Sequence, residues 1–239
     1  SEFFHDREHK YYCRCSFEEI LDTKTHMCHF VSEKRALNAK IVEKFRCFVQ
    51  TYKVHIVCLG PLISDYCIDV SVFSDVYGLT LTGCDDVIGF ESLTGIDTLS
   101  IMNCKNIDFN NLAKTGVRNL TIDDYKIDDV SMLGSIQNII LKNICDLDNV
   151  CGLSTVHTLT LFGCDDVRDV SMLGGLRGLV LECCDGISDV SALRYIPTLK
   201  IIDCDHVSDF SMLGSVDTLF IGNNGCINSG RGLETVRVL

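Results

Sequence analysis

The sequence is poor in proline, lacks tryptophan and has no long apolar run. Its 239 residues include two prolines, Pro61 and Pro197, and 46% of them are hydrophobic. A disordered chain would be richer in proline and poorer in leucine, isoleucine and valine, so we expect a folded core. No stretch approaches the roughly 20 apolar residues that a membrane-spanning helix needs. We therefore expect no segment embedded in a membrane.

Basic residues are also scarce. The chain has 21 lysines and arginines against 33 aspartates and glutamates, which gives a formal net charge of −12. A field of that sign repels phosphate groups, so neither nucleic acid nor an anionic membrane surface is an expected partner. The charge instead suits a basic patch on a protein partner.

The motifs of common enzyme classes are absent. The sequence has no Gly-x-Ser-x-Gly elbow, no phosphate-binding loop and no His-Glu-x-x-His. We predict that the chain is not an enzyme, with no catalytic residues and no cofactor. The acidic pairs Asp85-Asp86, Asp128-Asp129 and Asp165-Asp166 lack the glycine-aspartate density of calcium-binding repeats, so we interpret them as solvated loops.

Cysteine, in contrast, is abundant, with 15 residues. Five of them recur at multiples of 20 residues: Cys84, Cys104, Cys164, Cys184 and Cys204. Such spacing marks a repeat position and favours the reduced thiols of a cytosolic protein over a disulfide framework. The charged, aromatic segment from Ser1 to Cys15 does not resemble a signal peptide, so we expect a cytoplasmic location. The glycosylation pattern Asn119-Leu-Thr121 is accordingly expected to be unused.

A pattern of about 20 residues recurs through residues 54–239. One copy reads Val156-His-Thr-Leu159-Thr-Leu161-Phe-Gly-Cys164-Asp-Asp-Val167-Arg-Asp-Val170-Ser-Met-Leu173. Eight copies begin at Leu79, Leu99, Leu120, Ile139, Leu159, Leu179, Leu199 and Leu219, and a less regular one begins at Val57. We predict about eight repeats, with Leu239 opening a further copy, because an internal period of this length is typical of a solenoid.

These copies resemble the leucine-rich repeat signature L-x-x-L-x-L-x-x-N/C-x-L. They depart from it after Cys164, where two residues rather than one precede Val167. The Asp-Val-Ser-Met-Leu phrase is similar to short-repeat members, in particular leucine-rich repeat and F-box proteins of giant DNA viruses of amoebae (marseillevirus and mimivirus type). The resemblance implies an α/β-type solenoid, with a parallel β-sheet on the concave face and 3₁₀ turns or loops on the convex face. It also implies a protein-binding role, in the host cytoplasm if the chain is viral.

The residues themselves favour the same architecture. Leu159 and Leu161 alternate as in a strand with one buried face. Asp169 and Ser171 are residues that cap turns, and so short a copy leaves room for a 3₁₀ turn rather than a full α-helix. At the Cys164 position the chain turns inward, and a small thiol can share its S–H with the turn backbone. We expect three glycines to break the 3₁₀ turn: Gly134, Gly174 and Gly214.

Residues 1–53 do not match the repeat, and we predict an N-terminal helical cap for the first copy. Ser16-Phe-Glu-Glu19 has the form of a capping box, and a second helix is expected over 32–50. The alternative is a divergent F-box, a helical module of ubiquitin-ligase adaptors, although its Leu-Pro entry motif is absent. A zinc site is a further alternative, but the ligand spacing fits poorly, so we predict no metal. Its candidate ligands are His9, Cys13, Cys15, His26, Cys28 and His29.

The strand residues that flank the buried leucines are expected on the concave face, where short-repeat proteins bind their partners. We predict eight partner-binding residues there: Ile140, Lys142, Phe162, Val180, Glu182, Lys200, Ile202 and Phe220. The apolar members either mark an interaction surface or are isolated strand residues with high β-propensity. At the C-terminus, Val236, Val238 and Leu239 would leave an open strand edge, which predicts weak self-association.

Overall fold

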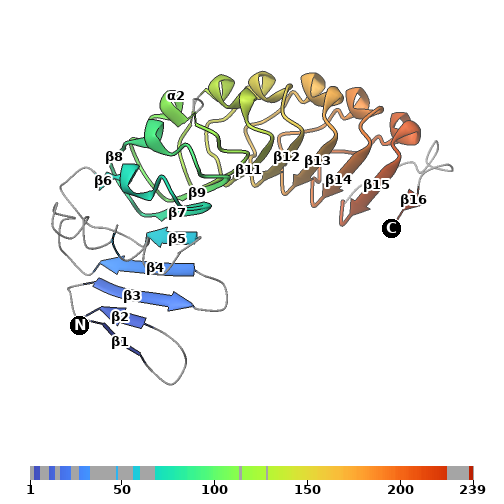
Figure 1. Ribbon diagram of the computed structural model, residues 1–239. Helices are drawn as coiled ribbons and strands as arrows, with labels where there is room; N and C mark the ends of the chain where they lie inside the picture. The colour runs from blue at the N-terminus through green and yellow to red at the C-terminus, as the bar shows by residue number, and fades with distance from the viewer. Residues whose placement is uncertain are drawn as a thin grey trace. The chain divides into compact units, whose positions relative to one another are not determined.

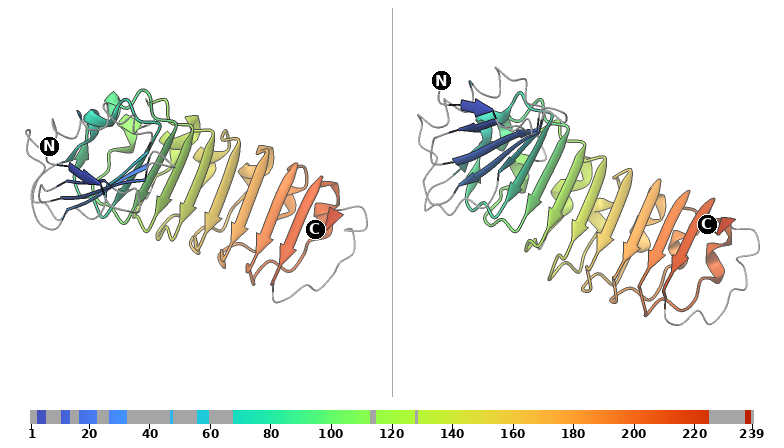
Figure 2. Two further views of the ribbon diagram at one scale, coloured as in Figure 1. Left: turned by 60° about the horizontal axis from the view of Figure 1, so that its bottom comes forward. Right: turned by 90° about the horizontal axis from the view of Figure 1, so that it is seen from below.

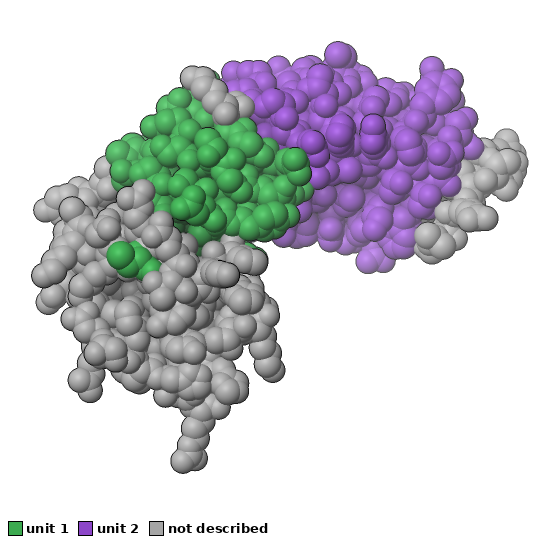
Figure 3. All heavy atoms as spheres, in the orientation of Figure 1, with its two compact units in different colours: residues 1–120 green, residues 121–239 purple. Residues whose placement is uncertain are grey.

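The computed structural model describes ten segments of the chain: residues 3–5, 11–13, 17–22, 27–32, 47, 56–59, 68–112, 115–127, 129–224 and 237–238. These form two compact units, residues 1–120 (unit 1) and residues 121–239 (unit 2), which Figure 3 colours separately. Both units contain copies of the predicted repeat. The strand β10 (Asn119–Asp123) spans the boundary between them.

Unit 2 contains a parallel β-sheet that advances by one strand with each copy of the repeat (Figures 1 and 2). Leu159 pairs with Leu179, and Leu179 pairs with Leu199, as the sequence period predicts. Its five-residue strands are β11 (Asn138–Lys142), β12 (Thr158–Phe162), β13 (Gly178–Glu182), β14 (Thr198–Ile202) and β15 (Thr218–Gly222). This arrangement confirms the predicted solenoid class.

Short 3₁₀ helices lie on the side of unit 2 opposite the sheet (Figure 2). They are η3 (Ser131–Ser135), η4 (Cys151–Leu153), η5 (Ser171–Gly175), η6 (Ser191–Leu193) and η7 (Ser211–Ser215). Each is preceded by an Asx cap; the Oδ1 atom of Asp169, for example, accepts the backbone N–H of Ser171 at 2.8 Å. The predicted 3₁₀ turns and their aspartate caps are therefore confirmed.

The core of unit 2 consists of equivalent residues stacked from copy to copy. In one copy the buried side chains are Leu159, Leu161, Cys164, Val167, Val170, Leu173 and Leu176, all at most 1% exposed. Because each copy covers the apolar edge of its neighbour, no copy has a separate core of its own. Burying each leucine contributes about 1.5–3 kcal/mol relative to leaving it exposed.

The glycines of the 3₁₀ segments have a different role from the predicted one. Gly174 lies inside η5 and does not break it. A Cβ atom built on Gly174 would lie 2.5 Å from the carbonyl oxygen of Ala192 in the next copy. Gly134 has the same relation to the carbonyl oxygen of Gly152, at 2.6 Å. These glycines are needed because neighbouring copies approach closely, so the prediction of a turn breaker was wrong.

Unit 1 repeats the same plan less regularly. Its strands β5 (Ile56–Leu59), β7 (Gly78–Thr82) and β9 (Thr98–Met102) pair in parallel, with Leu79 opposite Val57 and Leu99. On the other side are η1 (Val70–Phe73), η2 (Phe90–Ser92) and a short helix α2 (Phe109–Leu112). A small parallel pair, β6 (Ile68–Asp69) and β8 (Val87–Ile88), joins two adjacent copies.

The N-terminal segment contains strands where we predicted a helix. The capping-box segment forms β3 (Phe17–Asp22), which pairs antiparallel with β4 (Met27–Ser32), and β4 pairs parallel with β5. The helix predicted from Ser16 was wrong, because an open sheet edge offers backbone partners that outweigh a local capping signal. The strands β1 (Phe3–His5) and β2 (Tyr11–Cys13) form a separate antiparallel pair. Of the second predicted helix, only Ser32, at the end of β4, and the helical Cys47 lie among the described residues.

The C-terminal strand differs from the predicted register by one residue. The strand β16 (Arg237–Val238) pairs parallel with β15, and Val238 lies opposite Leu219. Val238 therefore takes the place that we predicted for Leu239, which lies outside the described residues together with Val236. The last copy is thus shorter than the regular repeat by a single position. The predicted self-association through this edge stays a prediction.

Candidate interaction surface on the sheet of unit 2

The sheet of unit 2 has one buried face and one face that is open to solvent. Along β11 and β13, buried residues alternate with partly exposed ones; in β15 the alternation ends at Ile221, which is partly exposed. The positions that are not buried form three rows across the strands. The row at the strand starts holds small or polar residues, Asn138, Thr158, Gly178, Thr198 and Thr218, and the other two rows, row one and row two, carry the predicted site residues. Row one contains Ile140, Thr160, Val180, Lys200 and Phe220; row two contains Lys142, Phe162, Glu182, Ile202 and Gly222. We call these ten residues the sheet face, and all eight predicted site residues lie on it.

Apolar residues cross the sheet face in a zigzag. Each strand presents one apolar side chain, and it alternates between the two rows from one strand to the next. We call this set the apolar track: Ile140, Phe162, Val180, Ile202 and Phe220. Diagonal neighbours on adjacent strands are about 7–8 Å apart, within the reach of aromatic and long side chains. The members of the track thus lie on adjacent strands, although they belong to five different copies of the repeat.

Gly222 shapes the end of the track, and sequence reasoning missed it. A Cβ atom built on Gly222 would lie 3.0 Å from Cε1 of Phe220 and 3.8 Å from Cγ1 of Ile202. The ring of Phe220 thus extends over the backbone of Gly222 beside Ile202. The available signal was the glycine itself, because the other four strands carry a larger side chain at the equivalent position.

The charge of the sheet face differs from that of the whole chain. Lys142, Glu182 and Lys200 are its charged residues, so the face carries +2 − 1 = +1, against −12 for the whole chain. Lys200 is exposed, and the other two are half-buried. Each shares its strand with a member of the apolar track, so charged groups border that track on both rows.

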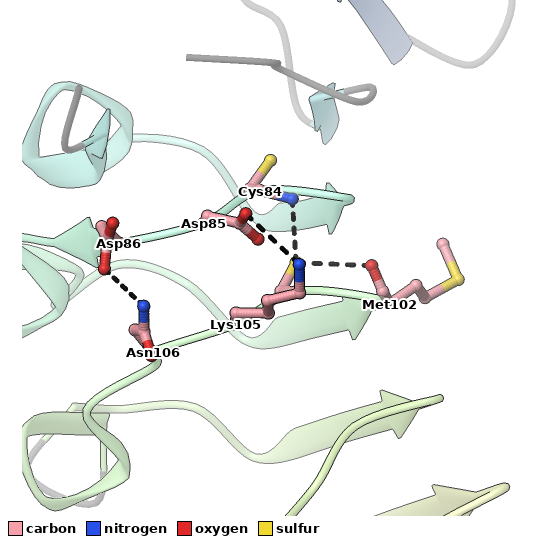
Figure 4. Close-up of polar contacts among 7 residues, drawn as sticks. Cys84, Asp85, Asp86, Met102, Lys105 and Asn106 are labelled. Atoms are coloured by element: carbon pink, nitrogen blue, oxygen red, sulfur yellow. Dashed lines mark hydrogen bonds and ion pairs between the residues drawn. The ribbon is translucent and has the colours of Figure 1, made fainter. Parts of the chain in front are cut away.

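The acidic pairs outside the sheet connect neighbouring copies. In unit 2, the Oδ1 atom of Asp165 accepts the N–H of Asp185 at 3.2 Å, and Asp185 in turn accepts the N–H of Asp205 at 3.3 Å. Figure 4 shows the corresponding part of unit 1, where Asn106 donates to Asp86 at 2.7 Å and Lys105 lies 3.8 Å from Asp85. These contacts give the exposed aspartates a structural role.

One open hollow, of about 330 Å³, lies among Asp146, Asp148, Asp166 and Arg168. Asp166 there accepts the N–H of Asp146 at 2.9 Å. Among the residues that the structure describes, no three His, Cys, Asp or Glu side chains gather as a metal site requires. The side chains of the N-terminal zinc candidates lie outside the described part of the chain.

The repeated cysteines fill the inward turn after each strand. The Cys184 thiol donates to the carbonyl oxygens of Glu182 at 3.3 Å and Leu161 at 3.5 Å. Burial raises the pKa of the Cys164 thiol; the pKa of Cys184 is raised by its hydrogen bond with Cys204 and by burial. Asn224 takes the same place, donating to the carbonyl oxygen of Ile201 at 3.1 Å. These contacts confirm the predicted sharing of the thiol proton. The raised pKa values disfavour a nucleophilic thiolate at Cys164 and Cys184, whereas hydrogen bonds with Cys84 and Cys184 lower the pKa of Cys104, to about 7, and of Cys204, respectively.

Two further observations concern sites that the sequence raised. The side-chain amide of Asn119 donates to Asp97 at 2.7 Å and lies on β10, so the glycosylation pattern is engaged in the fold. Within the described segments, no helix is both long and apolar enough to span a bilayer.

The strands, turns and buried ladder can be compared with known proteins. No protein-family profile matches this chain, and no curated protein matches it in sequence. Among solved structures, an internalin (inlF) from Listeria monocytogenes is similar, with a TM-score of 0.58. The fold is that of a leucine-rich repeat solenoid. The similar region covers 88% of this chain but 66% of the internalin chain, just under two thirds, at 20% sequence identity. At 20% identity, the similarity to the internalin shows a shared fold and nothing about function.

Proposed function

We propose that this chain is a non-enzymatic scaffold that binds a protein partner through the sheet face of unit 2. The observation that carries the proposal is the apolar track, which places two phenylalanines and three aliphatic side chains on the open side of a sheet. Contiguous apolar side chains on a surface are typical of an interaction site. Solvent-facing strand positions need no such residues for folding.

Structural roles of the reactive groups support a binding function over catalysis. Asp169 and its equivalents cap 3₁₀ helices, and Cys164 and Cys184 are buried with raised pKa values. A catalytic site would need a nucleophile and a base within hydrogen-bonding reach of each other and of a substrate. Asp169 and Cys184 instead form hydrogen bonds with backbone groups of unit 2.

The cellular setting is part of this proposal. Ten cysteines in the described part of the chain are free thiols, which supports a reducing cytoplasm. The likeness to proteins of giant DNA viruses depends on the Asp-Val-Ser-Met-Leu phrase, and it would place the chain in a host cytoplasm. The ubiquitin-ligase adaptor has less support, since β3 and β4 lie within residues 1–53 whereas an F-box is helical. Binding of residues 1–53 to the ligase linker subunit is its direct test.

The test compares two double variants of the full chain in affinity purification from native cell extract. Phe162→Ser with Phe220→Ser removes the aromatic part of the track. Met172→Ser with Met212→Ser is the matched control, because those side chains are 56% and 47% exposed on the 3₁₀ side. We expect the first variant to lower partner recovery at least about tenfold, as loss of central aromatic contacts does, and the control to leave it unchanged. Equal recovery by both variants, with thermal unfolding intact, would contradict the proposal.

A further inference from the structure

We infer that the occupant of the sheet face is an amphipathic α-helix of the partner protein, laid across strands β11–β15 and bordered by acidic residues. This inference rests on the proposed function, and it specifies the shape and charge of the partner. It follows from the spacing of the apolar track and from the three charged residues beside it.

The apolar track has two periods. Neighbouring strands are about 4.8 Å apart, so the track changes row every 4.8 Å or so and returns to the same row after about 9.6 Å. Ile140, Val180 and Phe220 are the members of row one, and Phe162 and Ile202 lie between them in row two. Any ligand that contacts all five side chains must present apolar groups with both periods.

A helix meets this requirement. Apolar residues at heptad positions a and d alternate between two sides of one stripe, and each side repeats every seven residues, or about 10.5 Å. The mismatch with the track is about 1 Å per two strands, which side chains absorb by small rotations. About 13 helical residues would cover the four strand spacings from β11 to β15.

An extended segment fits the track less well. Its same-face side chains lie in one line, about 6.7 Å apart. Against strands spaced by about 4.8 Å, such a segment falls out of step by about 2 Å at every strand. It also cannot follow the alternation between Ile140 and Phe162. The track therefore favours a helix over an added strand or an extended loop.

The charges beside the track define the flanks of the helix. Lys142 borders the track in row two and Lys200 in row one, so acidic residues on both flanks of the helix would face them. Glu182 lies in row two between these lysines and selects for one basic residue. The face carries a net +1 on a chain of −12, so the charge of the sheet face is opposite in sign to that of the whole chain.

Gly222 supports the same geometry at the end of the track. Because row two has no side chain on β15, the ring of Phe220 lies beside Ile202 and occupies that space. The last two members of the track thus form one broad apolar end, which suits a large aliphatic side chain of the helix.

Three fluorescent peptides of about 18 residues, long enough for some four to five helical turns, test the inference against the full chain by fluorescence anisotropy. The first is a helix held by a hydrocarbon staple, with leucines at a and d and glutamates on both flanks. The second has the same composition with leucines at alternate positions. The third is the stapled helix with lysines on its flanks. Measurements at about 0.15 M and about 0.5 M salt separate local contacts from the long-range field of the chain.

We expect the first peptide to bind at least tenfold more tightly than the second. It should bind about fivefold more tightly than the third, as two ion pairs at the protein surface allow. Lys200→Glu should reduce or reverse that charge preference. Phe162→Ser with Phe220→Ser should weaken the first peptide at least tenfold, whereas Met172→Ser with Met212→Ser should leave it unchanged.

Other results would overturn the inference in distinguishable ways. Equal binding of the first two peptides, or no binding of either, refutes the helix; the proposed function then still stands if the phenylalanine variant loses its cellular partner. Insensitivity of both the peptides and the partner to that variant refutes both proposals. A doubled mass by light scattering that the phenylalanine variant abolishes would assign the sheet face to a second copy of the chain.

Discussion

Gly174 and Gly175 are adjacent residues of η5 with very different surroundings. A Cβ atom on Gly174 would meet the carbonyl oxygen of Ala192 at 2.5 Å, whereas one on Gly175 would meet nothing within 4 Å. Comparing alanine substitutions at these two positions therefore separates the effect of packing between copies from the effect of replacing glycine on the backbone alone.

We predict that Gly174→Ala lowers the free energy of unfolding by about 1–3 kcal/mol, because the neighbouring copy must shift. Gly175→Ala should leave it unchanged or raise it by up to about 1 kcal/mol, because alanine restricts the unfolded chain. Urea denaturation of both variants provides the measurement. A Gly174→Ala protein as stable as the Gly175→Ala protein would show that the copies are not packed this closely.

The aspartate caps make the stability of unit 2 dependent on pH. Hydrogen bonds from the hydroxyl and the N–H of Ser171 hold the pKa of Asp169 below its ordinary value, and the pKa values of Asp129, Asp189 and Asp209 are lowered by their own serines. A lowered folded-state pKa stabilises the fold above the unfolded value of about 3.9, and this contribution disappears as the pH falls through the folded value.

We therefore expect the caps to contribute fully to the free energy of unfolding at neutral pH and to lose that contribution below about pH 4. Asparagine can cap without titrating, as Asn149 does when it accepts the N–H of Cys151 at 2.9 Å. Replacing Asp169, Asp189 and Asp209 by asparagine should reduce the loss of stability below about pH 4. The measurement is the free energy of unfolding in urea as a function of pH. If the triple variant has the same pH dependence as the original chain, the aspartate caps are not the cause of that dependence.

At the scale of elements, the repeat makes whole copies interchangeable. Residues 159–178 form one copy, and Leu179 already pairs in the register of Leu159. Deleting them joins Thr158 directly to Leu179, so β13 can replace β12 beside β11. We expect a folded protein whose free energy of unfolding is lower by about 1–3 kcal/mol, the average share of one copy.

Deleting only residues 159–168 is the control for this prediction. It would place the cap segment that begins at Asp169 where a strand belongs, and we expect loss of the cooperative transition. Circular dichroism with thermal unfolding distinguishes the two deletions. If the half-copy deletion folds as well as the whole-copy deletion, the sheet does not add one strand for each complete copy of the repeat.

Elements with a repeated pattern could be predicted from the sequence, and isolated ones could not. The register of Leu159, Leu179 and Leu199 follows from spacing alone, because an identical copy offers the same buried positions each time. The segment Phe17–Asp22 has no repeated counterpart in the chain. Its capping-box residues predict a helix and do not indicate that the segment pairs at the edge of a sheet. Local propensity is a weak guide where tertiary pairing decides.

The candidate site was predictable in part for the same reason. Alternation placed Phe162 and Phe220 on the open side of the sheet, and the structure places both there. The zigzag order of the track depends on register between strands, which no single copy contains. The position of the Phe220 ring over Gly222 depends on side-chain packing between β14 and β15, so it needed coordinates.

At the scale of the whole molecule, the proposed binding surface and the contacts that join the copies lie on opposite sides of the same copies. In unit 2 the 3₁₀ helices and aspartate contacts join neighbouring copies, whereas the sheet face carries side chains that the fold does not bury completely. The overall charge of −12 repels phosphate groups, which supports the proposal of a protein partner.

The most direct measurement of the central claim is photocrosslinking in native cell extract, with a benzophenone side chain placed at Thr160 or at Met172. Thr160 lies in row one between Ile140 and Val180, and Met172 is exposed on the 3₁₀ side of the same copy. We predict a defined protein adduct from Thr160 and none from Met172. An adduct from Met172 alone, or the same adduct from both positions, would contradict a binding role for the sheet face.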